Sequence, residues 1–209
     1  MWTMSTPKIP ARKPRGSYHH GNLRRALVDE AVRTIGQSGV GALTLRGVGA
    51  ALGVSRTALY RHFADKDALL AAVACEGFIA LTAALAEPRT RVPDLPGQLT
   101  AMGAAYVRFA IDHQAHYRVM FGGFLERCRD EPGLVADATA AFDVLVGMIR
   151  DLRAARLVRE DDVRQLSLFV WATVHGIAML AIDGQLGPDS RAGVALYDAS
   201  ADRLRAGLA

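Results

Sequence analysis

The residues whose types and spacing suit a defined chemistry lie between Thr44 and Lys66, in the run TLRGVGAALGVSRTALYRHFADK. This run is rich in side chains that donate hydrogen bonds: hydroxyls, guanidinium groups, a phenol, an imidazole and an ammonium group. Such donors suit phosphate oxygens and the edges of bases in a groove. The sequence therefore predicts that this stretch recognises nucleic acid.

Short helices joined by a tight Gly-Val-Ser turn must hold these side chains in place. Thr44, Ser55 and Asp65 are residue types that cap helix starts, and Asn22 is expected to cap an earlier helix. This arrangement is typical of a helix-turn-helix that reads DNA. Periodicity and breaks predict nine helices over residues 22–37, 45–53, 56–63, 66–86, 97–112, 114–121, 133–156, 161–185 and 191–207, with a loop over 89–96.

The helix predicted over 56–63 has the two faces that a recognition helix needs. Leu59 and Phe63 face inward, and its polar side chains face outward. Thr44 and Lys66 lie at helix starts, where free backbone N–H groups, a hydroxyl or an ammonium group hold phosphate. An ordinary helical hairpin with a polar face is the alternative. The predicted core of this unit is Leu27, Ile35, Leu45, Val48, Leu52, Val54, Leu59 and Phe63.

Charge is divided unevenly along the 209 residues. Residues 1–66 carry 11 lysines and arginines against 3 acidic residues, whereas residues 67–209 carry 14 arginines against 18 acidic residues. Only the basic front is therefore expected to meet a polyanion. With 51% apolar and 22% charged residues and no convincing strand, the chain is predicted to be an all-α protein with a sizeable core.

Several other classes of protein do not fit the sequence. Cys75 and Cys128 share no metal or redox spacing, so neither a metal site, a cofactor nor a disulfide framework is expected. The N-terminus lacks the apolar core of a signal peptide. The longest apolar stretch, 167–182, has 16 residues, fewer than the roughly 20 of a membrane span. We expect a cytoplasmic protein with no membrane partner.

The stretch from Tyr18 to Glu76 resembles the N-terminal domain of the TetR family of bacterial transcriptional regulators. The similarity rests on the segments YHHGNLRRALVDEA, ALTLR, ALGVS and ALYRHFADKDALL. The resemblance implies contacts to double-stranded operator DNA, mostly to phosphates, with Ala58 and Arg61 nearest to base edges. The implied DNA-binding residues are Thr44, Arg46, Ser55, Arg56, Thr57, Ala58, Tyr60, Arg61, His62 and Lys66.

Two glycines depart from the family pattern. Gly47 and Gly49 lie in the second helix, where such helices usually carry better helix formers. Each glycine costs about 1 kcal/mol relative to alanine in a helix interior. Packing by Leu45, Val48 and Leu52 is expected to outweigh this cost.

The second part of the chain is rich in bulky apolar residues, which form a core or line an apolar cavity with polar handles at Tyr106, Tyr117, His113, His116 and His175. The segments WATVHG at 171–176 and HYRVMFG at 116–122 resemble a C-terminal subgroup of the family, marked by a Trp, a His and a following Gly. A small apolar or amphipathic effector is the expected ligand. Its expected contacts are Phe78, Met102, Tyr106, Phe109, Tyr117, Met120, Phe121, Phe124, Phe142, Trp171, His175 and Met179.

The family resemblance also implies a homodimer through the helices near 161–185 and 191–207. One recognition helix covers too few base pairs for specificity, so such proteins work as two-fold dimers. The nearly continuous apolar stretch 167–182 supports an interface there, and a fully buried helix within the subunit is the alternative. Ala172, Gly176 and Ala181 form a small-residue face for close helix packing.

We expect three parts: a basic flexible arm (1–17), a helix-turn-helix DNA-binding domain (18–66) and a ligand-binding and dimerisation domain (67–209). The expected function is that of a TetR-type regulator, most simply a repressor, released when an effector pushes on the helix over 66–86. The alternatives are a redox-responsive regulator acting through Cys75 or Cys128 and a helical interaction protein that binds no DNA. An enzyme is not expected, because no nucleophile, metal cluster or phosphate loop accompanies the acidic pairs.

Overall fold

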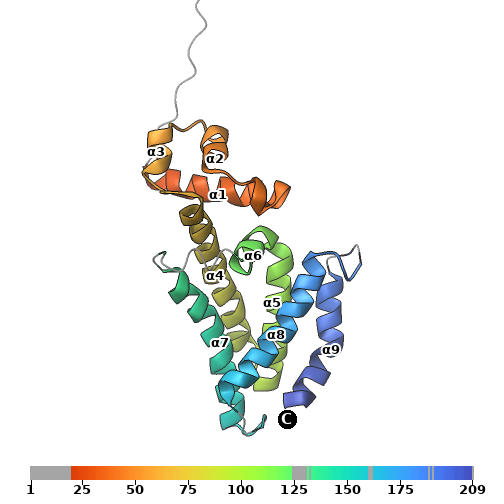
Figure 1. Ribbon diagram of the computed structural model, residues 1–209. Helices are drawn as coiled ribbons and strands as arrows, with labels where there is room; N and C mark the ends of the chain where they lie inside the picture. Colours follow the sequence, from red (N-terminus) through yellow and green to blue (C-terminus); the bar gives the residue numbers. More distant parts are fainter. Residues whose placement is uncertain are drawn as a thin grey trace, which may run out of the picture.

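The computed structural model describes residues 20–123, 131, 133–159, 162–187, 189 and 191–208. Over these residues the chain forms nine α-helices and one 3-10 helix and no strand, which confirms the predicted all-α fold (Figure 1). The predicted arm over 1–17 lies outside the described residues. The elements are α1 (His20–Ser38), η1 (Val40–Ala42), α2 (Leu45–Ala51), α3 (Arg56–Tyr60), α4 (Lys66–Arg91), α5 (Leu95–Asp112), α6 (Gln114–Met120), α7 (Leu134–Ala154), α8 (Val163–Ile182) and α9 (Ala192–Leu208).

Three helices begin at the residues predicted to cap them. The Thr44 hydroxyl accepts a hydrogen bond from the N–H of Gly47 at 3.0 Å, at the start of α2. The Ser55 hydroxyl accepts from the N–H of Ala58 at 3.2 Å, at the start of α3. Asp65 caps α4 in the same way. Each bond satisfies a backbone donor that the helix leaves without a partner, and such a cap is worth about 1 kcal/mol.

The N-terminal unit, which we define as α1 to α3, has its own small core. Of the eight residues predicted to form it, six are buried, while Leu52 and Val54 are half-buried against them. The sequence reading missed Val28 and Leu43, both fully buried. Val28 was missed because it lies beside, and not on, the apolar stripe chosen for α1. Leu43 lies between η1 and α2, where helical periodicity gives no signal.

Several helix ends differ from the predicted ones. α1 begins at His20, so Asn22 lies inside its first turn and is not its cap. α3 ends at Tyr60, three residues earlier than predicted, because the chain tightens into a turn around the carbonyl of Leu59. The ends of α5 to α9 lie within three residues of the predicted ones.

The largest difference is at the end of α4, which runs to Arg91 with Pro88 inside it. A proline removes one backbone donor and crowds the preceding turn, so the sequence predicted an end near residue 86. Pro88 lies in the last turn, where only one helical bond is lost, and its ring is buried. The N–H of Val92 still donates to the Pro88 carbonyl at 3.0 Å. The predicted loop over 89–96 is therefore reduced to residues 92–94.

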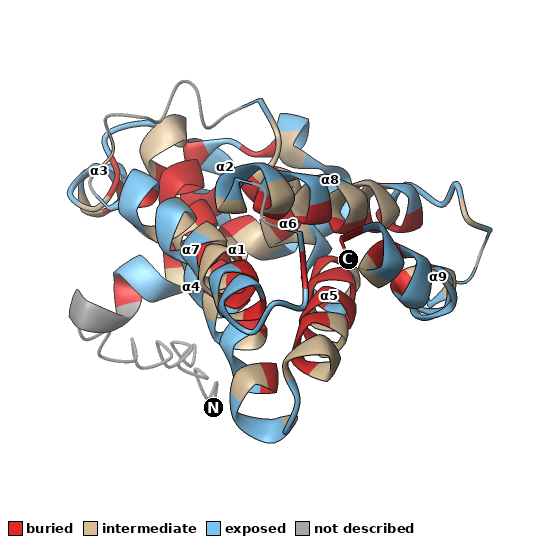
Figure 2. Cartoon of the chain, turned by 90° about the horizontal axis from the view of Figure 1, so that it is seen from below, coloured by how far each residue is buried: buried red, intermediate tan, exposed pale blue. Residues whose placement is uncertain are grey.

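α4 is the central helix of the C-terminal unit, which we define as α4 to α9. It packs against α7, α5 and α6 and also against α1, and α5 packs in turn against α8 and α9. Figure 1 shows α4 running from the N-terminal unit down through this bundle. Figure 2 shows that buried residues gather on the inward faces of these helices. A single helix thus connects both units.

α8 is strongly apolar but is buried on one side only. By length and composition α4 and α8 could each cross a membrane, yet 56% of the most apolar window of α4 is buried inside the protein, against 33% for α8. Burial identifies α4 as a core helix. On α8, Leu168, Phe169 and Leu180 are exposed. The alternative of a fully buried helix over 167–182 is therefore wrong, and α8 presents an apolar face.

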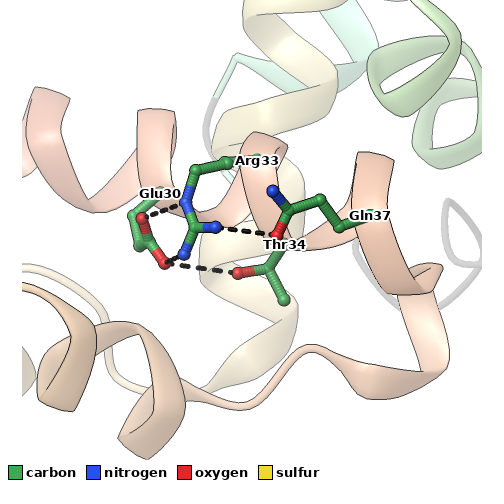
Figure 3. Close-up of polar contacts among 4 residues, drawn as sticks. All are labelled: Glu30, Arg33, Thr34 and Gln37. Carbon is green, nitrogen blue, oxygen red and sulfur yellow. Dashed lines mark hydrogen bonds and ion pairs between the residues drawn. The ribbon is translucent and has the colours of Figure 1, made fainter.

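The exposed side of α1 carries a network of polar side chains that bond to one another within the helix (Figure 3). Arg33 Nε donates to Glu30 at 2.8 Å, and Arg33 Nη1 donates to the Gln37 side-chain oxygen at 2.7 Å. The hydrogen bond from Arg33 holds the pKa of the Glu30 carboxyl below its ordinary value, because it favours the ionised form. The charge of Arg33 is thus already paired within α1.

Candidate nucleic-acid interface and ligand cavity

The ten residues expected to bind DNA lie on α2, α3 and the start of α4 and in the caps and turns beside these helices. Ala58, His62 and Lys66 are half-buried, and Ala58 packs against the hydrophobic core. Ala58 therefore has only part of its surface free for a base edge. The other seven are exposed: Thr44, Arg46, Ser55, Arg56, Thr57, Tyr60 and Arg61.

The arginines of this surface differ from Arg25 and Arg33 of α1, each of which has an acidic partner. Within the described part of the chain, no carboxylate pairs with Arg46, Arg56 or Arg61. On α1, Arg25 pairs with Asp29 at 2.8 Å, and Arg33 is paired as described above. Guanidinium groups without an internal partner keep their hydrogen-bond donors available for phosphate.

Lys66 makes a contact that the sequence did not predict. Its ammonium group donates to the Val40 carbonyl at 3.0 Å, across 26 residues of sequence. This bond ties the start of α4 to η1 and so fixes how α4 leaves the N-terminal unit. Two of its three ammonium donors remain for a phosphate.

Gly49 lets α2 and α3 approach each other closely. A β-carbon at position 49 would lie 3.2 Å from Leu59 Cδ2 and 3.6 Å from Val54 Cγ2. Leu59 is only 2% exposed, so this contact is part of the core that holds α3 in place. The departure from the family pattern at Gly49 therefore has a packing reason. Gly47 instead lies against its own cap, Thr44.

The C-terminal unit contains a cavity of about 300 Å³ between α4, α5, α7 and α8. Its volume falls at the lower end of the range for small-molecule sites. Its walls are almost wholly apolar. Its lining residues are Phe78, Leu81, Leu85, Leu99, Met102, Gly103, Tyr106, Phe121, Ala138, Ala141, Phe142, Leu145, Arg164, Leu168, Val170, Trp171 and Val174.

Four polar side chains form a hydrogen-bonded cluster on one wall of this cavity. The Tyr117 hydroxyl lies 2.7 Å from His175 Nδ1 and 3.0 Å from the Tyr106 hydroxyl. Trp171 Nε1 donates to the same Tyr106 hydroxyl at 3.1 Å. Tyr106 and Trp171 line the cavity, whereas Tyr117 and His175 lie behind them. The groups nearest the cavity are therefore already hydrogen-bonded to protein.

Burial keeps this cluster uncharged at neutral pH. It raises the pKa of Tyr106 to about 12 and raises the pKa of Tyr117 further, because a buried phenolate is poorly solvated. Burial also lowers the pKa of His175. We assign the imidazole proton to Nε2, since Nδ1 then accepts the short hydrogen bond from Tyr117. Two phenols and a neutral imidazole result.

The residues expected to bind an effector separate into three groups. Phe78, Met102, Tyr106, Phe121, Phe142 and Trp171 line the cavity. Tyr117 and His175 support it from behind, while Met120, Met179 and Phe109 pack elsewhere. Phe124 lies outside the described residues. Of the other expected handles, His113 borders a separate surface groove and His116 packs at the contact of α6 with α4.

Arg164 is the lining residue whose omission from the sequence analysis matters most. It lies on the same helical face as Leu168 and Trp171, four and seven residues later, and that spacing was the available signal. Arg164 was not predicted because it is neither apolar nor aromatic.

Cys75 is poorly suited to redox sensing. Burial and a hydrogen bond with Asp137 raise the pKa of its thiol to about 11. The thiolate, which is the reactive form, is therefore scarce at neutral pH. Cys128 lies outside the described residues.

Comparison with curated proteins identifies a relative of part of the chain. An HTH-type transcriptional repressor of Mycobacterium tuberculosis, Rv1474c, is 41% identical over 58 residues, which make up 28% of this chain. The match spans 31% of that protein's length, so the chain corresponds to less than a third of this relative.

Solved structures resemble the whole fold. A protein of unknown function from Rhodococcus sp. RHA1 is 35% identical with a TM-score of 0.78, over 93% of this chain and 100% of that chain. A tetR-family regulatory protein from Rhodococcus RHA1 is 23% identical with a TM-score of 0.70, over 87% and 95%. The second similarity shows a shared fold.

Two family matches cover most of the chain. Residues 27–73 match the bacterial regulatory proteins of the tetR family, and residues 99–204 match the tetracyclin repressor-like C-terminal domain. The second match alone spans half of the 209 residues. Together with the capped helix-turn-helix and the all-α fold, these matches show that the chain belongs to the tetR family and is a transcriptional regulator, not an enzyme.

Proposed function

We propose that the chain is a repressor that binds a palindromic operator as a homodimer and releases it when a small apolar or amphipathic molecule enters the cavity. The exposed, unpaired basic surface on α2 and α3 is the observation that carries this proposal. The name of the M. tuberculosis relative, a transcriptional repressor, favours repression over activation. We assign DNA binding to residues 18–66, ligand binding and dimerisation to 67–209, and the chain to the Trp-His-Gly subgroup.

In the proposed complex α3 enters the major groove. Arg56, Thr57, Tyr60 and Arg61 are the exposed polar side chains of α3 and its C-terminal turn that reach DNA. Thr44 and its neighbours contact the flanking phosphates, which position α3 without reading sequence. The low acidic content of this surface leaves that attraction unopposed.

The proposed dimer uses α8 and α9. Phe169 is 53% exposed, and Leu180 and Leu196 are each 39% exposed, so apolar surface is available on both helices. A β-carbon at Gly176 would meet nothing within 4 Å, which leaves room for a second helix. By contrast, Ala181 is buried against Gly193 of α9 and packs within the subunit.

α4 supplies the proposed connection between ligand and DNA. It begins beside the DNA-binding surface at Lys66 and lines the cavity with Phe78, Leu81 and Leu85. A ligand that favours one position of α4 and an operator that favours another weaken each other's binding by the same factor.

The DNA-binding part is tested by selecting sequences from a random double-stranded library with the full chain. A palindrome with half-sites about one helical turn apart, ~34 Å or a little more, is expected. In a salt titration, log K falls as log salt rises. Arg56→Ala and Lys66→Ala should each reduce the steepness of this fall by about 1. The matched control Arg150→Ala, exposed on α7, should not change it. An unchanged slope for Arg56→Ala would contradict the proposed interface.

The release part needs a separate measurement. Small apolar molecules that raise the melting temperature of the full chain are titrated into its operator complex, followed by fluorescence anisotropy of the DNA. At least one should weaken operator binding. If stabilising ligands leave operator affinity unchanged, the chain is a DNA binder without the proposed effector response.

A further inference from the structure

The polar side chains at the cavity differ in whether their hydrogen-bond donors are already used within the protein. Trp171 Nε1, the two tyrosine hydroxyls and His175 Nδ1 bond to one another. A ligand that approached Tyr106 or Trp171 with a hydrogen-bond acceptor, such as a carboxylate, would have to break one of these bonds. The wall formed by Tyr106 and Trp171 therefore favours the apolar end of a ligand, although it contains four polar residues.

Arg164 is the exception. It lines the cavity near the start of α8 and is itself exposed, with its guanidinium carbon 5.7 Å above the centre of the Phe142 ring. Within the described residues no carboxylate pairs with it. A cation held over an aromatic ring keeps its edge donors free. Arg164 is thus a cation with donors available at the solvent side of the cavity.

One face of α8 connects these two environments. Arg164, Leu168 and Trp171 follow each other along this face, and all three line the cavity. The side chains become less exposed from Arg164 toward Trp171 along this face: Arg164 and Leu168 are exposed, whereas Trp171 is half-buried. Arg164 and Trp171 are seven residues apart on the helix, a separation of about 10 Å along the helix axis. The cavity therefore has a charged side chain at its exposed side and apolar walls farther inside.

We infer that the ligand of this cavity is an apolar carboxylic acid whose carboxylate pairs with Arg164 while its hydrocarbon part fills the space lined by α4, α5, α7 and α8. A planar guanidinium matches a carboxylate with two parallel hydrogen bonds. The volume of about 300 Å³ is at the lower end of the range for small-molecule sites, so the hydrocarbon part should be short. A chain of about ten carbons is therefore a suitable probe. The inference rests on the proposed effector function and specifies its ligand.

The test compares three probes of equal chain length: decanoate, decanol and decyltrimethylammonium. Binding to the full chain is measured by isothermal titration calorimetry at low salt, for the wild type, Arg164→Gln and the control Arg150→Gln. In Arg164→Gln the preference for decanoate over decanol should fall about fivefold, as for an exposed ion pair, and the cationic probe should bind more tightly. Arg150→Gln should retain the wild-type preference, since Arg150 does not line the cavity.

Salt provides a second measurement that does not depend on a variant. Raising the ionic strength should weaken wild-type binding of decanoate while leaving decanol unaffected, because the ion pair is at the solvent side. A headgroup preference that is the same in Arg164→Gln and in the wild type overturns the inference. So does failure of all three probes to bind the wild type.

The outcome for the ligand is separable from the outcome for the function. Decanoate binding that depends on Arg164 but leaves operator affinity unchanged supports the ligand class and contradicts the release mechanism. Binding independent of Arg164 contradicts the ligand class, whereas release by another stabilising molecule would still support the mechanism.

Discussion

On α3, Arg56 and Tyr60 are exposed and make no hydrogen bond or ion pair through their side chains to the described residues, whereas in the C-terminal unit Tyr106 and Tyr117 are buried and bonded to their neighbours. The same kinds of polar group thus serve opposite purposes in the two units. Free donors on a surface attract a charged partner. Donors that satisfy each other in a core leave an apolar surface for a partner to fill. The difference accounts for the proposed binding of a polyanion at one end of the chain and of an apolar molecule at the other.

Four predictions test this comparison, three of them with matched substitutions. The largest effect is expected from truncating a leucine in each unit. Leu59→Ala should lower the free energy of unfolding by about 2–5 kcal/mol, because Leu59 is enclosed by α2 and the core. Leu145→Ala should cost less, about 2 kcal/mol, because Leu145 already has the cavity on one side and loses fewer contacts. Urea denaturation of both variants measures the two costs, and equal values would contradict the difference.

The second pair removes one hydroxyl from each unit. Tyr117→Phe should destabilise the fold by about 1–2 kcal/mol, since it deprives His175 of its short hydrogen bond, and should leave the salt slope of operator binding unchanged. Tyr60→Phe should leave stability within about 0.5 kcal/mol, because Tyr60 is 44% exposed, and should weaken operator binding. Thermal unfolding and anisotropy distinguish the two effects. The comparison fails if both variants change the same property.

A smaller effect is expected from acid. Burial lowers the pKa of His116 and of His175, so the unfolded chain takes up protons on these residues at a higher pH than the folded chain does. Stability should therefore be highest above about pH 6.5 and should fall as the pH drops below it. Urea titrations between about pH 7.5 and 5.5 measure this. His116→Asn should reduce the pH dependence, and a rise in stability on acidification would contradict the prediction.

The smallest effect is expected at the network of Figure 3. Arg33→Ala should lower the stability only slightly, because the pair that it makes with Glu30 lies on an exposed helix face and is screened by solvent. Its operator binding should keep the wild-type salt slope, in contrast to Arg56→Ala, although both lose one positive charge. A reduced slope for Arg33→Ala would show that total charge, and not the position of unpaired charge, sets the affinity for DNA.

Much of the fold could be predicted because its signals are local. Thr44, Ser55 and Asp65 cap their helices as expected, since a cap depends only on the next three residues. The end of α4 could not be predicted, because a proline usually ends a helix, whereas Pro88 lies buried in the last turn of α4. The predicted start of α1 at Asn22 was wrong because a residue type that caps helices well can also lie inside a helix.

The candidate sites were predictable to different degrees. The proposed DNA-binding surface lies within one short stretch, so sequence alone placed most of its residues at exposed positions. The cavity depends on helices far apart in sequence, and apolar character could not distinguish Met102, which lines it, from Phe109, which does not. Nor could the sequence indicate that the Lys66 ammonium group would donate a hydrogen bond to the Val40 carbonyl. Those facts depend on how helices pack.

Gly77 has a mechanical consequence for the chain. A β-carbon there would lie 2.4 Å from Met120 Sδ and 3.2 Å from His116 Cβ, so the backbone of α4 rests directly on the side chains of α6. One residue away, Glu76 lies 3.6 Å from Arg25 of α1. Closely packed interiors have low compressibility and transmit strain. Met120 and His116 thus occupy the space of a side chain at position 77, so α6 cannot move toward α4 at this point unless the Met120 side chain moves aside.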